Sequence, residues 1–330
     1  MGDFFYRLQR FEYWPTAAQY FPVLVSWPYL CLKGKNLLFF TAVNPFIYGG
    51  GSFGESKSEI LNSLPAAYVP KSILVNPGEK LPENLSFPIV VKPDIGERGS
   101  LVTIIHSANE LDQYHQNIGR KFLLQDYLSS NFEAGVMVIR EPESGSFRIT
   151  SIAVKEFLTV TGDGKKTLRE LIMELPRARF QWERLKSKIE DGKVLKVGES
   201  LLLEPIGNHC RGTIFRNKNH LITPELTRVM TELASSIKDF HFGRFDLKAE
   251  SEEKFKRGET IKIMELNGAF SEPGHIYDPE ASILGSWKDL LIHWNQLAGI
   301  AGNNIKSGHR PLTLKELWTL YRNHCQLGLV

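Results

Sequence analysis

A short segment of strictly alternating side chains restricts the fold of this chain more than any other feature. In residues 263–267 the polar Glu265 and Asn267 alternate with the apolar Met264 and Leu266. Successive side chains of a strand point to opposite faces, so Glu265 and Asn267 share one face and we expect Met264 and Leu266 to face the other, buried side. The pattern predicts a half-buried strand with one accessible polar surface.

A second polar pattern, Gly-Arg-Phe-Asp at 243–246, indicates the start of another strand in which Arg244 and Asp246 share a face. If the two strands pair, Asp246, Glu265 and Asn267 converge. Carboxylate, amide and phosphate oxygens are the ligands that Mg²⁺ takes, so the three side chains are candidate ligands of Mg²⁺ or Mn²⁺, and Arg244 can reach the same phosphates. The alternative is a solvated strand edge.

Composition and charge exclude several protein classes. The 330 residues, 42% hydrophobic and 23% charged, are typical of a globular chain of two or three lobes. Forty basic and 37 acidic residues are interspersed, which argues against a nucleic-acid partner. Three distant cysteines without CxxC spacing disfavour a disulfide framework or a cysteine zinc site and suit a reducing cytosol.

The first 48 residues are unusually aromatic and carry scattered Lys and Arg. Their apolar core at 20–32 is shorter than the roughly 20 residues that a spanning helix needs, and it contains Pro22 and Pro28. We expect neither a transmembrane segment nor a signal peptide. Two interpretations remain: a segment that lies in a membrane interface, or an arm that packs on the core or on a partner in a homodimer. We therefore expect a cytoplasmic protein, peripheral at the inner face of the membrane under the first interpretation.

The remaining patterns predict α+β lobes rather than one doubly wound sheet, with the boundaries 1–85, 86–127 and 128–330. Strands are expected at 87–92, 101–105, 121–127, 134–140, 147–158, 244–248 and 260–266. Capping signals predict helices after Ser107, Thr167, Thr223 and Thr313, and a charged helix is expected over 177–190.

A lysine at the end of an apolar strand precedes a glycine-bearing loop: Lys92 is followed by Gly96, Gly99 and Ser100. Glycines let backbone N–H groups approach a phosphate, and a fixed cation neutralises its charge. The loop is not a Walker A motif, because GK[ST] is missing and a strand follows. The alternative is a β-hairpin with a surface lysine.

Two further strands carry candidate groups. The strand 122–128 ends in polar residues whose backbone can meet a purine edge, and Glu133 can bind ribose hydroxyls. Lys155 ends the apolar run 152–155, so it faces a cavity, a phosphate or solvent, because burying an unpaired lysine is costly.

In order and spacing, these motifs resemble those of the ATP-grasp superfamily, and within it the D-alanine–D-alanine ligases and cyanophycin-synthetase-like carboxylate–amine ligases. The resemblance covers about residues 55 to 285 and implies an ATP-grasp fold, two α/β lobes that clasp ATP, with an atypical N-terminal segment. The implied ATP contacts are Lys57, Lys92, Gly96, Gly99, Ser100, Gln125, Asp126, Tyr127, Leu128, Glu133 and Lys155. The implied magnesium ligands are Asp246, Glu265 and Asn267, and Arg244 is implied to neutralise the transferred phosphoryl group.

The chain departs from the family at two places. Gln125 stands where the family often has Glu, and the first 55 residues do not look like the usual Rossmann-like lobe, which helps to bind the first substrate. The Ser271–Gly274 stretch looks like the substrate loop, with Gly274 and His275 at its end. Arg211 is our candidate oxyanion donor, and His209 or His275 could take a proton from the amine.

The resemblance implies a ligase that activates a small-molecule carboxylate with ATP as an acyl phosphate and joins it to an amine or a thiol. The substrate is open among an amino acid, a peptide and an amphiphilic acid. Two alternatives share the nucleotide residues: a phosphotransferase, and a non-enzymatic membrane-associated nucleotide-binding module.

Overall fold

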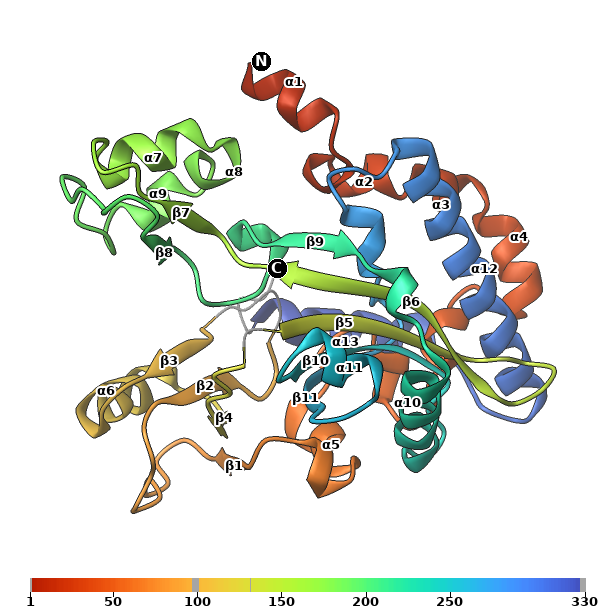
Figure 1. Cartoon of the computed structure of the whole chain (residues 1–330). Helices are drawn as coiled ribbons and strands as arrows, with labels where there is room; N and C mark the ends of the chain where they lie inside the picture. Colours follow the sequence, from red (N-terminus) through yellow and green to blue (C-terminus); the bar gives the residue numbers. More distant parts are fainter. Residues whose placement is uncertain (1, 97–100, 131, 327–330) are drawn as a thin grey trace.

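The computed structural model describes residues 2–96, 101–130 and 132–326 (Figure 1). Two antiparallel sheets form its framework. The first has the strand order β1-β4-β2-β3, with bounds Ser72–Val75, Phe122–Asp126, Ile89–Pro93 and Thr103–Ile105. The second has the order β11-β10-β5-β6-β9, with bounds Lys262–Asn267, Phe242–Ala249, Phe132–Arg140, Phe147–Glu156 and Ile214–Asn217. A small third sheet pairs β7 (Thr159–Thr161) with β8 (Ser200–Leu202).

Helices surround these sheets and confirm the predicted α+β class. In chain order they are α1 (Asp3–Leu8), α2 (Thr16–Gln19), α3 (Phe21–Val25), α4 (Trp27–Gly34), α5 (Lys57–Asn62), α6 (Ala108–Ile118), α7 (Leu168–Glu174), α8 (Pro176–Arg179), α9 (Trp182–Leu185), α10 (Pro224–Ser236), α11 (Glu252–Lys256), α12 (Ile283–Lys306) and α13 (Leu314–Gln326).

The capping signals in the sequence mark real helix starts. The side chains of Ser107, Thr167, Thr223 and Thr313 each accept a hydrogen bond from the backbone N–H three residues later. At Thr167 the Glu170 carboxylate also accepts from the Thr167 N–H, which completes a capping box. The helix after Thr223 ends at Ser236.

The charged helix expected over 177–190 is wrong. The segment forms only the short helices α8 and α9, followed by turns. Arg177 is buried, donates to the Thr213 carbonyl at 3.2 Å and forms an ion pair with Glu12. These distant contacts fix the segment, and they outweigh its local helical preference.

The long helix α12 is not anticipated by the sequence analysis, because Gly285, Gly299 and Gly302 interrupt its apolar pattern. At Gly302 the reason for glycine is the close approach of α4. A Cβ atom there would lie 2.4 Å from the Lys33 carbonyl oxygen. Glycine therefore lets two helices pack closely, at a cost in helix propensity that the packing offsets.

The five-stranded sheet is buried on one face by α10, α11 and α5. Alternating residues of its strands enter this core, among them Ala134, Val136, Val138, Ile152, Phe245 and Leu247. Leu226, Met230 and Leu233 of α10 complete it. This layer holds the sheet that carries the predicted site residues.

The opposite face of the same sheet changes in character along its length. At one end Met137, Ile139 and Phe242 are buried under α12. Toward the other end the same face carries Glu133 and Asp246, each paired with a cation. The alternation of strand side chains thus places a charged surface next to an apolar core on one face.

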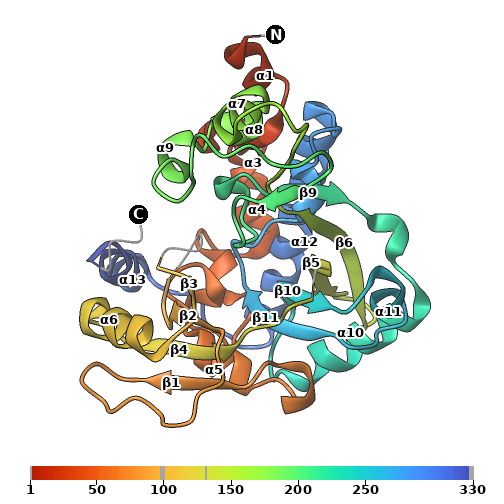
Figure 2. The same cartoon turned by 60° about the vertical axis from the view of Figure 1, so that its left-hand side comes forward.

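Residues 11–48, which we call the N-terminal arm, cover α12 and the apolar end of this face (Figures 1 and 2). The buried residues of the arm include Phe11, Val23, Leu30, Phe39 and Phe40. Its outer side exposes Phe21, Val25, Tyr29 and Leu32, and Leu24, at the edge of the cleft, is exposed as well. The arm therefore packs on the core, while its exposed apolar side chains leave contact with a membrane as a prediction. Within residues 2–96, 101–130 and 132–326, the helices fall short of what a bilayer-spanning segment requires in length and apolar character.

Candidate functional site

A cleft of about 850 Å³ lies between the two large sheets, and most of the predicted site residues line it. One wall comes from β2, β4 and the loop after β2. The other comes from β5, β6, β10 and β11, and the N-terminal arm closes one end. The volume lies in the upper part of the range of about 300–1,000 Å³ that is usual for small-molecule sites.

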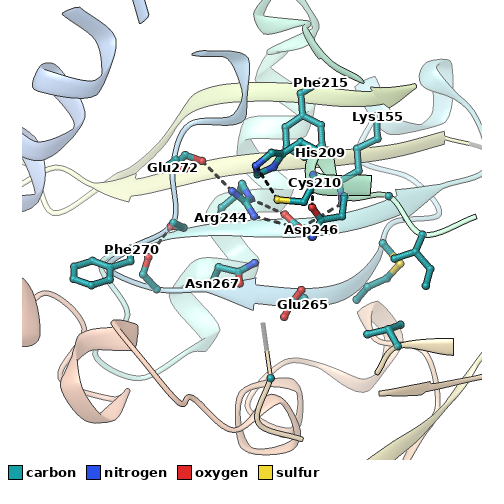
Figure 3. Close-up of a pocket in the computed structure, with 18 of the residues that line it drawn as sticks. Lys155, His209, Cys210, Phe215, Arg244, Asp246, Glu265, Asn267, Phe270 and Glu272 are labelled. Atoms are coloured by element: carbon teal, nitrogen blue, oxygen red, sulfur yellow. Dashed lines mark hydrogen bonds and ion pairs between the residues drawn. The ribbon is translucent and has the colours of Figure 1, made fainter. Parts of the chain in front are cut away.

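The strands β10 and β11 pair as the sequence predicts. Asp246 lies directly opposite Glu265, and Arg244 lies directly opposite Asn267. All four side chains line the cleft, and Figure 3 shows them along adjacent strands. The predicted convergence of Asp246, Glu265 and Asn267 is therefore confirmed as geometry.

The expected orientation of Met264 is wrong. Leu266 is buried in the core, but Met264 lines the cleft. The register shifts between Asp246 and Leu247, so that Met264 is skipped in the pairing. Such a bulge turns a side chain away from the alternation and leaves backbone groups without a ladder partner.

Lys92 uses the backbone group that the bulge exposes. Its ammonium group donates to the Met264 carbonyl at 2.8 Å and to the Gln125 side-chain oxygen at 3.1 Å. Burial lowers the pKa of Lys92 to about 8, and the Glu265 carboxylate opposes this shift without reversing it. A buried cation with a depressed pKa gains a favourable partner when an anion enters the cleft.

Lys155 projects from β6 on the other wall and is already paired with carboxylates. Its ammonium group lies 2.7 Å from Glu133 and 3.4 Å from Asp246. Burial opposes its charged form, but Asp246 and Glu133 outweigh burial and hold the pKa of Lys155 above its usual value. Lys155 therefore stays charged at physiological pH.

Arg244 and Asp246 form a two-point ion pair, with Nε–Oδ1 at 2.7 Å and Nη2–Oδ2 at 3.5 Å. Burial alone would raise the pKa of Asp246, but Arg244 and then Lys155 lower it below its usual value. The pair lies across Gly135 of β5, where a Cβ atom would lie 3.1 Å from Arg244 Cδ and 3.3 Å from Asp246 Oδ1. A glycine at this position makes room for the pair.

Lys57, at the start of α5, joins the loop after β2 to the β11 strand. Its ammonium group donates to the Gly96 carbonyl and lies 3.3 Å from a Glu265 oxygen. Gly96 lines the cleft. Gly99 and Ser100, which we also expect at the phosphates, lie outside the described residues.

The predicted purine contacts Gln125, Asp126, Tyr127 and Leu128 all line the cleft. The side chain of Gln125 accepts from Lys92 and donates to the Ser72 hydroxyl at 2.9 Å. Val90, Val102, Ile104 and Met264 line the cleft as well.

Glu133 also lines the cleft, and it pairs with a residue that the sequence analysis overlooks. Lys248 lies 3.8 Å from Glu133 and its ammonium group donates to the Leu128 carbonyl at 3.0 Å. The two-residue period of the strand does indicate Lys248, because it places Lys248 on the same face as Arg244 and Asp246.

Two carboxylates and an amide fit the way in which Mg²⁺ is usually held. Magnesium binds through one or two protein carboxylates and completes its shell with substrate phosphates and water. The part of the chain that the structure describes has no group of three or more His, Cys, Asp or Glu side chains placed to hold a metal. Asn267 contributes an observation of its own: its Nδ2 atom is buried without a hydrogen-bond partner among the described residues. This N–H donor fits an acceptor oxygen of a bound ligand such as a phosphate, while the Asn267 Oδ1 atom is the one that would bind a metal ion.

Three expected residues do not line the cleft. Arg211 lies 3.5 Å from Glu204. His275 is hydrogen-bonded to the Ser151 hydroxyl at 2.7 Å and lies 3.1 Å from Asp289. The Gly274 backbone packs against Ala153.

Other groups near these positions do face the cleft. His209 stacks on Tyr277 with ring centroids 5.3 Å apart, and its Nε2 lies 3.4 Å from the Cys210 sulfur. Glu272, which the sequence analysis does not single out, accepts hydrogen bonds of 2.5 Å from Tyr20 and Tyr277. Figure 3 shows His209, Cys210 and Glu272 around Arg244.

No protein-family model matches the chain, and no curated protein sequence matches it. Among solved structures, the ATP complex of D-alanine–D-alanine ligase from Bacillus anthracis is 14% identical, with a TM-score of 0.40, over 80% of this chain and 64% of that ligase. An L-amino acid ligase from Bacillus licheniformis is 15% identical, with a TM-score of 0.39, over 77% of this chain and 49% of that enzyme. The ADP complex of an N5-carboxyaminoimidazole ribonucleotide synthetase is 19% identical, with a TM-score of 0.40, over 71% of this chain and 50% of that enzyme.

This chain thus spans between about half and two thirds of the length of these solved enzymes. At such low identities and TM-scores the matches concern the fold alone and carry no argument about activity. By name, the three solved enzymes are ligases or a synthetase, the class of protein whose motifs this sequence resembles.

Proposed function

We propose that this protein is an ATP- and magnesium-dependent ligase, which activates a carboxylic acid as an acyl phosphate and transfers the acyl group to an amine. One observation carries the proposal. Lys92 on one wall of the cleft faces a surface on the other wall that holds Lys155 and the opposed carboxylates Asp246 and Glu265. Cations from both walls and a pair of carboxylates are what a triphosphate with its metal ion requires.

The purine of ATP would lie among the apolar side chains of both walls, Val90, Ile104 and Met264, beside the polar end of β4. Glu133 would accept hydrogen bonds from the ribose. Lys248, which donates to the Leu128 carbonyl, holds this end of β4 against the five-stranded sheet.

Phosphoryl transfer depends mainly on positioning and on charge neutralisation. Lys92 and Lys155 would approach the phosphates from opposite walls. Asp246, Glu265 and Asn267 would hold Mg²⁺, which when bound neutralises charge on the phosphate oxygens. Arg244 would approach the γ-phosphoryl group as an oxygen of the acid bonds to phosphorus and the bond to ADP breaks.

The second step forms the C–N bond. The amine nitrogen attacks the acyl carbon, phosphate leaves with the bonding electron pair, and the nitrogen loses one proton. His209, which lines the cleft, would accept that proton. The Glu272 carboxylate, which also lines the cleft, would attract an amine that arrives as an ammonium ion.

The test is hydroxylamine trapping. Purified protein with Mg-ATP, a carboxylic acid and hydroxylamine should release ADP and phosphate and form a hydroxamate, and the Lys92→Ala variant should form none. ADP release with a phosphorylated alcohol and without hydroxamate would indicate the phosphotransferase instead. A protein that does not bind Mg-ATP in calorimetry would exclude both reactions.

The outer side of the N-terminal arm supports a second part of the proposal, contact with a membrane surface. Phe21, Val25 and Leu32 are exposed there, and Lys33 and Lys35 follow at the end of α4. Between Glu12 and Glu55 the sequence has no acidic residue. Apolar side chains with neighbouring cations favour an anionic lipid interface.

A further inference from the structure

Beyond the charged site, the part of the cleft next to the N-terminal arm is lined mainly by apolar and aromatic side chains, and we call this part the apolar compartment. It is built jointly by the N-terminal arm, the loop after β11 and α12. Six of its lining residues are Tyr20, Val23, Leu24, Trp27, Phe270 and Trp294.

Aromatic contacts hold the walls of this compartment in place. Trp294, which is only 4% exposed, lies at their centre. Its ring centroid is 6.1 Å from Tyr20, 5.6 Å from Trp27 and 6.0 Å from Phe270. Rings at these distances and tilted angles form favourable pairs. The compartment is therefore a preformed part of the cleft.

The compartment is continuous with the charged site at Arg244. The Arg244 Nη1 atom donates to the Glu272 carbonyl at 3.2 Å, and the Tyr20 hydroxyl donates to the Glu272 carboxylate at 2.5 Å. In Figure 3 Phe270 and Glu272 lie on the side of Arg244 that faces away from Lys155. A molecule with its carboxylate near Arg244 can therefore extend toward Phe270.

The far end of the compartment is rimmed by exposed apolar side chains of the arm. Leu24 lines the cleft and is 57% exposed, and its neighbours Phe21 and Val25 are exposed as well. The polar groups along this path are already engaged: Tyr20 and Tyr277 donate to Glu272, and Gln19, Ser52 and Ser271 donate to backbone carbonyls. A polar substrate body would therefore gain few new partners, and a buried polar group without a partner is costly. An apolar body would lose unfavourable contact with water throughout.

Resting on the proposed ligase function, we propose that this compartment binds the body of the acid, and that the substrate is a carboxylic acid with an apolar body, an acyl chain or an aromatic ring. Its carboxylate lies beside Arg244 and the γ-phosphate. The arm is thereby the specificity-determining element of the enzyme.

Hydroxylamine replaces the unknown amine in the test. Hydroxamate formation is measured with straight-chain acids from acetate to hexadecanoate and with phenyl-substituted acids. We expect kcat/KM to rise about three- to fourfold per added CH₂ until the compartment is full. Comparison of the phenyl-substituted acids with the straight-chain acids shows whether the compartment prefers an aromatic ring or an acyl chain.

Two variants change the size of the compartment in opposite directions. Leu24→Trp narrows it and should lower kcat/KM for long acids at least tenfold, with short acids unaffected. Phe270→Ala removes a ring that is 37% exposed and should move the optimum to longer acids. Leu32→Trp is the matched control, because Leu32 lies on the same arm, is 81% exposed and does not line the cleft.

The outcomes separate this inference from the proposed function. Hydroxamate formation without dependence on chain length, or an equal effect of Leu24→Trp and Leu32→Trp, would overturn the inference and leave the ligase intact. Direct binding of dodecanoate in the presence of Mg-ADP, followed by calorimetry, gives a readout that needs no turnover. Suppose that dodecanoate binds and that Leu24→Trp weakens this binding, while no acid yields a hydroxamate. That result would support the apolar compartment and refute the proposed ligase activity. If no acid in the series binds, the inference of an apolar compartment for the substrate is overturned.

Discussion

The ammonium group of Lys92 lies 2.8 Å from the carbonyl oxygen of Met264, and this hydrogen bond connects the two large sheets across the cleft. It exists because the bulge in β11 frees the Met264 carbonyl from the strand ladder. Both of these hydrogen-bond partners of Lys92, the Met264 carbonyl and the Gln125 side-chain oxygen, are neutral, so an anion that enters the cleft would stabilise the ammonium form.

Proton uptake on nucleotide binding should report on Lys92. Burial lowers the pKa of Lys92 to about 8, so near pH 8.5 most of the free protein carries it neutral. A triphosphate favours the ammonium form and raises the pKa, so Mg-ATP binding takes up protons at pH 8–9 and few at pH 6.5, where Lys92 is already charged. Calorimetry in buffers of different ionisation enthalpy measures the uptake.

The control for this prediction is Lys92→Arg, because an arginine stays charged throughout this range. It should bind Mg-ATP without the extra proton. Equal uptake by the wild type and by Lys92→Arg at pH 8.5 would contradict the assignment.

Asp246→Asn should destabilise the fold through the loss of its charge. The variant leaves Arg244 and Lys155 buried with one carboxylate fewer, which costs about 3 kcal/mol or more at pH 7. Arg244 and Lys155 outweigh burial and lower the pKa of Asp246 in the folded state. The stability advantage of the wild type is therefore complete above about pH 4 and is lost as the pH falls further, through the folded pKa.

Denaturant unfolding at pH 7, 4, 3 and 2 measures this difference in free energy of unfolding. Asp112→Asn, on the exposed side of α6, is the control and should change little. A wild-type advantage that does not change between pH 4 and 2 would rule out the ion pair as its source.

Glu265→Gln should raise the magnesium requirement of the reaction. The variant keeps the shape of the side chain but removes one of the two opposed carboxylates, and we expect acid-dependent ADP release to fall about 100-fold at low Mg²⁺. Part of the rate should return at high Mg²⁺ or Mn²⁺. Glu259→Gln is the control, because Glu259 is exposed and pairs with Arg257. A full-rate Glu265→Gln enzyme would remove Glu265 from the metal site.

Point variants on the outer side of the arm test contact with membranes better than deletion of the segment. Residues such as Phe11, Val23 and Phe39 are buried in the core, so removal of the arm would unfold the protein. Phe21→Asp combined with Leu32→Asp should reduce partitioning onto anionic vesicles at least tenfold, with Mg-ATP binding unchanged. Sedimentation with vesicles measures the partitioning, and equal sedimentation of variant and wild type would end the membrane proposal.

The part of the candidate site that the sequence predicts is the part that depends on the period of a strand and on the pairing of two strands. Glu265 and Asn267 share a face because of the two-residue period, and one pairing of β10 with β11 brings Asp246 opposite Glu265. The helix caps at Thr167 and Thr223 follow from the same kind of short-range rule.

The features that the sequence does not predict depend on distant contacts. Met264 faces the cleft because of a bulge that no local pattern indicates. Helix α12 tolerates Gly302 because α4 packs against it, and the 177–190 segment is broken by contacts of Arg177 with Glu12 and Thr213. The part of the cleft between the N-terminal arm and α12, too, follows only from how the arm packs against α12.

The order of the arm and its partners along the chain has a consequence for biosynthesis. The Ala18 carbonyl accepts from the Trp287 indole, 269 residues later, and Tyr20 bonds to Glu272, 252 residues later. At about 5–20 residues per second, a ribosome needs roughly 13–50 s to pass from Tyr20 to Glu272. During that interval the aromatic side chains of the arm lack the residues of α12 and of the loop after β11 that bury them in the folded protein. The cleft therefore acquires the wall that the arm forms only after Glu272 and α12 have been synthesised.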